Sequence, residues 1–130
     1  MLRYLSLDWI AALSDEVERS DAVREAATGR RIAVTQVVTD GPEGDVIYHL
    51  DVADGVARFG PGPAVAEDVR FVQDWDTAVA VATGAMNAQE AFIGGRIKLI
   101  GDQQRIPDSV PVFAALDSVF ARVRERTEHA

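Results

Sequence analysis

Cysteine is absent from this sequence of 130 residues, and histidine occurs twice, as His49 and His129. The absence of cysteine excludes disulfides, thiolate metal sites and cysteine nucleophiles. It also suits a reducing compartment.

Long apolar runs are missing as well. A transmembrane helix needs ~20 consecutive apolar residues, and no stretch of this chain approaches that length. Asp8 comes too early for the apolar core of a signal peptide. The final residues, Thr-Glu-His-Ala, are not a peroxisomal address of the Ser-Lys-Leu type. We therefore expect a cytoplasmic protein without stable membrane insertion.

Positive charge is scarce relative to negative charge. The chain has 13 Lys and Arg against 21 Asp and Glu, a formal net charge of −8. Nucleic acids and anionic membranes recruit clustered Lys and Arg, so neither is the expected partner. A hydrophobic content of 48% with 26% charged residues is typical of a globular protein. We expect residues 1–130 to form one domain.

The first part of the chain predicts helices. Ser6 is a plausible N-cap for a helix with Trp9, Ile10, Leu13 and Val17 on one face. A break near Ser20-Asp21, a second helical stretch through Thr28 and a stop at Gly29 follow. The narrow apolar stripe predicts an outer layer that lies on a sheet.

Alternation of apolar residues predicts five strands, and the turn signal Asp54-Gly55 joins the second to the third. Gly60-Pro61-Gly62-Pro63 is interpreted as a crossover, because its prolines cannot lie inside a sheet. Asp76 or Thr77 is expected to cap a helix through Ala82. The predicted fold is α+β, a five-stranded mixed sheet with helices packed on one side. Its strands are residues 31–39, 46–52, 56–59, 67–75 and 96–100, and its last helix is residues 109–126.

The segment Asn87–Asp102 is the most informative part of the chain. A short amphipathic helix with Ala91 and Phe92 leads into Gly94-Gly95, where a positive φ is expected. A strand then alternates to Gly101-Asp102. This segment resembles the signature of the sterol carrier protein 2 (SCP2) family. Residues 67–71 (Glu-Asp-Val-Arg-Phe) resemble its Ala-Asp-Val-Thr-hydrophobic strand, and residues 76–87 its helix and Gly-x-x-Asn bend.

The resemblance implies a small α+β domain around a hydrophobic tunnel for sterols and fatty acyl chains. Two departures stand out. The bend continues Asn87-Ala88 where the family usually has proline, and residues 103–108 replace a short apolar run. The second departure bears on the ligand, because that region and the last helix border the family's tunnel.

Apolar side chains of the later elements form either packed core or the wall of such a cavity. The amphipathic pattern alone favours core, whereas the resemblance favours a pocket wall, since such walls are mostly apolar. The candidate lining residues are Phe71, Trp75, Val79, Phe92, Ile97, Leu99, Phe113, Leu116 and Phe120.

Groups for catalysis are sparse. His49 and Asp51 share a strand face and could act as base and orienter, but no nucleophile is spaced to complete the site. Asp40, Glu43 and Asp45 lack the spacing of a calcium loop. We therefore predict no catalytic residues, no metal and no cofactor.

Two functions remain open. The first is a non-catalytic carrier of a hydrophobic small molecule, such as a sterol, fatty acid or acyl-CoA. The second is a ligand-free interaction module that acts with a partner enzyme, or that forms a homodimer.

Overall fold

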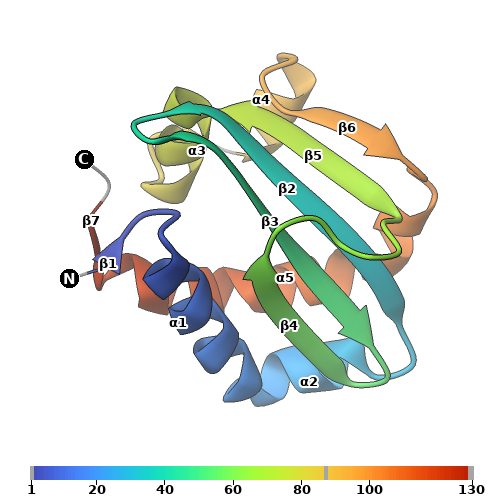
Figure 1. Ribbon diagram of the computed structural model, residues 1–130. Helices are drawn as coiled ribbons and strands as arrows, with labels where there is room; N and C mark the ends of the chain where they lie inside the picture. Colours follow the sequence, from blue (N-terminus) through green and yellow to red (C-terminus); the bar gives the residue numbers. More distant parts are fainter. Residues whose placement is uncertain (1, 87, 129–130) are drawn as a thin grey trace.

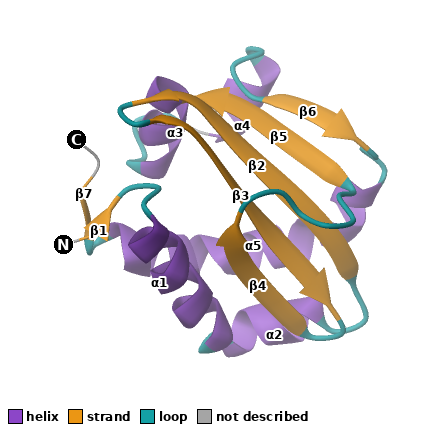
Figure 2. Ribbon diagram, in the orientation of Figure 1, coloured by secondary structure: helices purple, strands orange, loops and turns teal. Residues whose placement is uncertain are grey.

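A computed structural model describes residues 2–86 and 88–128, and Asn87 of the predicted bend lies outside them. The chain forms a five-stranded sheet with the strand order β4-β3-β2-β5-β6 (Figures 1 and 2). In this sheet β2 and β5 pair in parallel and the other neighbours pair antiparallel, so the sheet is mixed, as predicted. The strands are β2 (Arg31–Gly41), β3 (Gly44–Ala53), β4 (Val56–Pro61), β5 (Val69–Asp74) and β6 (Lys98–Gly101).

A second, two-stranded sheet was not predicted. It pairs β1 (Leu2–Arg3) with β7 (Thr127–Glu128) in parallel. The two ends of the described chain therefore lie side by side (Figure 1).

The helices lie on one side of the main sheet, which confirms the predicted layering (Figure 2). They are α1 (Leu7–Glu18), α2 (Asp21–Ala27), α3 (Trp75–Ala82), α4 (Ala88–Ile93) and α5 (Arg105–Arg124). Ser6 caps α1 by accepting a hydrogen bond from the Trp9 N–H at 3.2 Å. Ser20 caps α2 in the same way, so the predicted break between these helices is confirmed.

The two faces of the sheet differ in composition because side chains alternate along each strand. The inner face, toward the helices, carries buried residues such as Ile32, Val34 and Leu50. Four buried residues of α5, Val112, Leu116, Val119 and Val123, join the same core. The outer face is crossed by the connection between β4 and β5, which passes over β3 and β2 (Figure 1).

Several predicted boundaries were wrong, and three of them bear on the site. Trp75 is the first residue of α3 rather than the end of a strand, and Asp74 caps this helix by accepting the Thr77 N–H at 2.8 Å. The last strand begins at Lys98 rather than at residue 96. Helix α5 begins at Arg105 rather than at residue 109. Pro107 is tolerated in its first turn, where no backbone N–H is needed.

Two of the segments that resemble the SCP2 family meet at Asp68. The Asp68 carboxylate accepts the Ala33 N–H at 2.8 Å, and the Asp68 N–H donates to the Ala33 carbonyl at 2.9 Å. The Asp68 carbonyl also accepts the Asp102 N–H at 2.9 Å. The Gly101-Asp102 turn is thus held against the start of β5.

Gly101 and Gly95 of the same signature adopt positive φ values of 112° and 79° for different reasons. A Cβ on Gly101 would lie 2.4 Å from the Asp68 carbonyl oxygen. A Cβ on Gly95 would meet no atom within 4 Å. Glycine is therefore required at residue 95 only for its backbone conformation, as the sequence predicted. At residue 101 it is also required because a side chain would not fit.

Gly101→Ala is expected to lower the free energy of unfolding more than Gly95→Ala. The left-handed backbone alone costs about 1–2 kcal/mol for alanine at residue 95. The clash at residue 101 adds roughly a further 1–3 kcal/mol. Urea unfolding of the two variants measures the difference, and equal losses would contradict this account of the turn.

Candidate functional site

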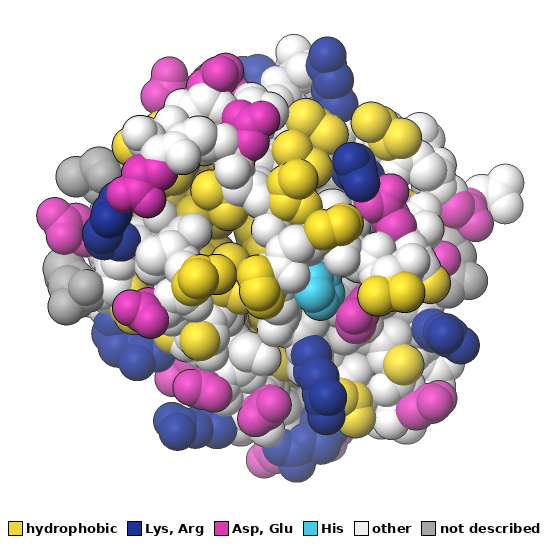
Figure 3. Space-filling model, viewed as in Figure 1, with side chains coloured by type: hydrophobic (Ala, Val, Ile, Leu, Met, Phe, Trp, Pro, Cys, Tyr) yellow, Lys and Arg dark blue, Asp and Glu magenta, His cyan; other side chains and the backbone are white. Residues whose placement is uncertain are grey.

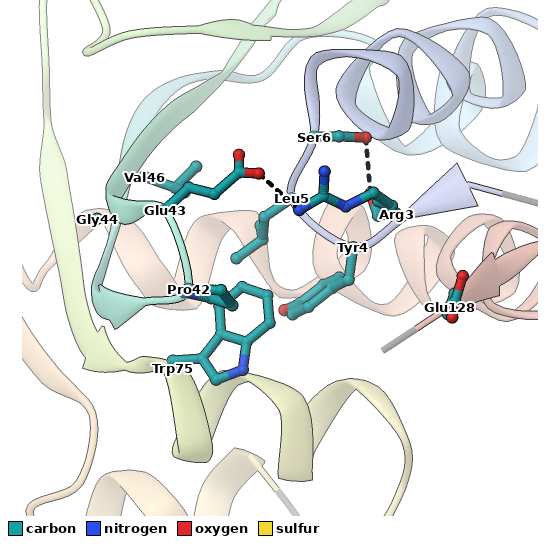
Figure 4. Close-up of a pocket in the computed structure, with 10 residues that line it drawn as sticks. All are labelled: Arg3, Tyr4, Leu5, Ser6, Pro42, Glu43, Gly44, Val46, Trp75 and Glu128. Atoms are coloured by element: carbon teal, nitrogen blue, oxygen red, sulfur yellow. Dashed lines mark hydrogen bonds and ion pairs between the residues drawn. The ribbon is translucent and has the colours of Figure 1, made fainter. Parts of the chain in front are cut away.

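A pocket of about 200 Å³ opens between the segment after β1, the tip of the β2–β3 hairpin and the start of α3 (Figure 4). Tyr4, Leu5, Val46 and Trp75 contribute its apolar wall. Charged residues, among them Arg3, Glu43 and Glu128, also border it. Hydrophobic side chains surround a hollow on the face shown in Figure 3. The pocket thus combines an apolar wall with charged neighbours.

The turn after β1 brings two of these side chains into position. Leu5 has a positive φ of 63° and is buried. A β-region backbone would not turn the chain so sharply between β1 and α1, and the burial of Leu5 offsets the strain of this conformation. The Tyr4 hydroxyl donates a hydrogen bond to the Ala78 carbonyl at 3.3 Å. The wall is therefore fixed from both α3 and the N-terminal segment.

An ion pair links the N-terminal segment to the hairpin tip. The Arg3 guanidinium lies 2.8 Å from the Glu43 carboxylate, and this hydrogen bond raises the pKa of Arg3 (Figure 4). Both side chains are mostly exposed, so the pair contributes little to stability.

Aromatic rings continue from the pocket into the core. Tyr4 packs against Trp75 with ring centroids 5.5 Å apart, and against Trp9 at 5.0 Å. Trp9 then contacts Tyr48, Tyr48 contacts Phe59, and Phe59 contacts Phe120 of α5. Trp75 and Phe120, both predicted lining residues, are thus connected through intervening rings rather than by direct contact.

The other predicted lining residues are distributed over several environments. Phe71, Leu99 and Phe120 are partly buried against the core, whereas Leu116 and Ile97 are buried. Val79 is partly buried, and Phe92 is 46% exposed. The side chain of Phe113 lies outside the described part of the structure. Of the predicted lining residues that the structure describes, Trp75 borders the pocket. A cavity shared by the full set stays a prediction.

Two glutamines on the inner face were not singled out from the sequence. The side-chain Oε1 atoms of Gln36 and Gln73 are shielded from solvent, and neither has a hydrogen-bond partner among the described residues. Alternation along the strands places both side chains on the inner face, but only the structure shows that their oxygens are unpaired.

His49 contacts the connection between β4 and β5 on the outer face of the sheet. Its Nδ1 lies 2.9 Å from the Gly62 carbonyl oxygen, which can only accept, so Nδ1 carries the proton. Its Nε2 lies 3.6 Å from Asp51. Ala64, in the same connection, donates its N–H to the Thr35 hydroxyl at a distance of 3.1 Å. The His49 ring therefore anchors the chain on the outer face of the sheet.

Among the residues that the structure describes, no group of three or more His, Cys, Asp or Glu residues is arranged to hold a metal ion. In residues 2–86 and 88–128, no helix has both the length and the apolar character needed to cross a membrane.

The architecture is that of SCP2-like sterol carrier domains. A crystal structure of sterol carrier protein 2 has a TM-score of 0.67 and 24% identity, covering 94% of this chain and 98% of that one. A conserved hypothetical protein of Thermus thermophilus, considered a candidate sterol carrier protein, has a TM-score of 0.72 and 22% identity, covering 98% and 92%. Sterol carrier protein 2 of Yarrowia lipolytica, in its apo form, has a TM-score of 0.62 and 16% identity, covering 87% and 88%.

These likenesses show that the chain has the SCP2 fold. They confirm the fold expected from the three sequence segments. No protein-family model matches the sequence, and no curated protein matches it.

The two tyrosines of the chain give the protein a predictable response to alkali. Burial raises the pKa of Tyr4 and of Tyr48 above the ordinary value. An unfolded phenol ionises near pH ~10, so above that pH the unfolded state binds fewer protons than the folded state. Below pH ~10 the two tyrosines therefore do not reduce the free energy of unfolding. Above that pH the free energy of unfolding falls by about 1.4 kcal/mol per pH unit for each tyrosine.

Urea unfolding at about pH 8 and about pH 11 measures this loss. Phenolate absorbance should stay low in the folded protein and rise only with unfolding. The double variant Tyr4→Phe/Tyr48→Phe serves as the control and should depend less on pH over this range. Early ionisation of either tyrosine in the folded wild type would contradict the burial argument.

Proposed function

We propose that residues 1–130 form one domain that binds or carries a hydrophobic small molecule, such as a sterol, a fatty acid or an acyl-CoA. The observation that carries this proposal is a pocket with an apolar wall of Tyr4, Leu5, Val46 and Trp75, within a fold shared with sterol carrier protein 2. Removing an apolar ligand from water contributes about 0.8 kcal/mol for each buried methylene group. No catalytic group is needed for that process.

The proposed ligand lies between the inner face of the sheet and helices α3 to α5. The pocket at Tyr4 and Trp75 has a volume of about 200 Å³, whereas ligand sites commonly have ~300–1,000 Å³. A ligand of sterol size therefore requires neighbouring side chains or helices to move. Phe71 and Leu99 are candidates for the extended wall, because both are partly buried at the margin of the core.

A second candidate function is an interaction module. Apolar side chains remain accessible on the outer face of the sheet, where Ile47 is 38% exposed and Ile100 is 55% exposed. A UbiJ-SCP2 ubiquinone synthesis protein has a similar fold, with a TM-score of 0.54 and 15% identity over 85% of this chain and 86% of that one. Such a module would bind a partner enzyme or a second copy through a protein surface instead of carrying a lipid.

Adjacent residues of β6 provide a matched test of the carrier proposal. Leu99 faces inward, whereas Ile100 faces outward. Leu99→Glu should weaken binding of a fluorescent fatty acid or sterol analogue by at least about tenfold, because an unpaired charge is heavily penalised in an apolar site. Ile100→Glu should leave that binding unchanged.

Trp75 emission, recorded in a Trp9→Phe background, reports the binding directly, and thermal unfolding shows whether each variant is folded. Absence of a saturable response of the folded wild type to any lipid class would overturn the carrier proposal. Loss of self-association or partner binding in Ile100→Glu alone would favour the interaction module.

A further inference from the structure

Gln36 and Gln73 are polar residues on the inner face of strands β2 and β5, whose other inward residues are apolar. Gln36 of β2 lies in register with Tyr48 of β3 and Phe71 of β5. Phe71 in turn pairs with Leu99 of β6. Gln73 lies in register with Val38, which in turn pairs with Val46. The two glutamines are therefore diagonal neighbours on the parallel strands β2 and β5, and they project from the same face.

Their position connects the two parts of the proposed ligand site. The residues in register with Gln36 across the sheet include Phe71 and Leu99, which are partly buried at the margin of the core. The row of Gln73 leads to Val46, which borders the pocket at Tyr4 and Trp75. A ligand that extends from this pocket along the inner face toward Leu99 would pass over both glutamines.

Each Oε1 atom is removed from solvent without a compensating hydrogen bond from the described residues. Such an unpaired acceptor destabilises a folded protein, because its hydrogen bonds to water are lost on folding. Packing does not require a glutamine here, since the neighbours in the same rows are apolar or aromatic: Tyr48, Phe71 and Leu99 for Gln36, and Val38 and Val46 for Gln73. Two unpaired carbonyl oxygens on neighbouring strands are therefore suited to accept hydrogen bonds from a bound molecule.

We propose that Gln36 and Gln73 select a hydrophobic ligand that carries a hydrogen-bond donor, a hydroxyl or an amide N–H, at its buried end. This inference rests on the proposed carrier function and specifies its ligand class. A carboxylate is an acceptor only and carries a charge, so a fatty acid anion does not satisfy two carbonyl oxygens. A lipid alcohol does, while its apolar body covers the surrounding side chains.

Matched ligands separate the hydroxyl from the apolar body. Diphenylhexatriene, a fluorescent hydrocarbon without polar groups, is bound first and then displaced by competitors. The competitors are dodecanol and dodecyl methyl ether, and cholesterol and cholesteryl methyl ether. Each ether keeps the apolar body and the oxygen of its alcohol but lacks the donor. The wild type should bind at least one alcohol about tenfold more tightly than its ether.

The double variant Gln36→Met/Gln73→Met keeps side chains of similar length and removes both acceptors. It should retain diphenylhexatriene and ether binding, and its preference for the alcohol should disappear. Without ligand it should unfold at the same temperature as the wild type or a higher one, because no unpaired acceptor remains buried. Gln103→Met, at an exposed position in the turn before α5, is the control and should keep the preference.

The outcomes distinguish this proposal from the one on which it depends. Failure of the folded wild type to bind diphenylhexatriene or any competitor would overturn the carrier function, and the ligand class with it. Binding of the hydrocarbon with equal affinities for alcohol and ether would overturn the ligand class alone. A lower unfolding temperature of the double variant, with the alcohol preference unchanged, would show that the glutamines have a structural role and would also overturn it.

Discussion

The parallel pairing of β2 with β5 is the constraint on which the arrangement of the other elements depends. Because β2, β3 and β4 alternate in direction, β4 runs the same way as β5 but lies at the opposite side of β3 and β2. The chain must therefore cross two strands before β5 can pair. It crosses on the outer face, where His49 and Thr35 bond its backbone. The inner face is left to the helices, so the apolar layer and the pocket lie on that side.

Much of the fold could be predicted because its local signals agree with one another. Alternation in residues 31–39 and 46–52 places the buried residues correctly, and Asp54-Gly55 joins β3 to β4 as expected. The predicted strand at residues 67–75 ended too late because Trp75 continues the alternation of Phe71 and Gln73. The capping hydrogen bond of Asp74 starts a helix there instead. The β1–β7 pair is too short for any periodic signal, and its partners come from opposite ends of the sequence.

Less of the candidate site could be predicted. An amphipathic stripe identified Leu116, but it cannot distinguish a core residue from a cavity wall, and Leu116 is 2% exposed within the core. Tyr4 and Leu5 were missed because their place in the pocket depends on a turn and on pairing with a distant strand. A polar residue on an inward position of a strand is a usable signal, and Gln36 and Gln73 both carry it. Whether such a residue finds a partner is decided by the packing of other elements.

The pairing of β1 with β7 has a consequence for anything joined to this chain. Arg3 of β1 and Glu128 of β7 both border the pocket, so the two ends of the described chain converge on the same opening. A bulky group attached through either end would start from a strand that forms part of this border. Neighbouring polypeptide could then obstruct the opening or shape it, and the choice of attachment point becomes a variable that acts on the pocket itself.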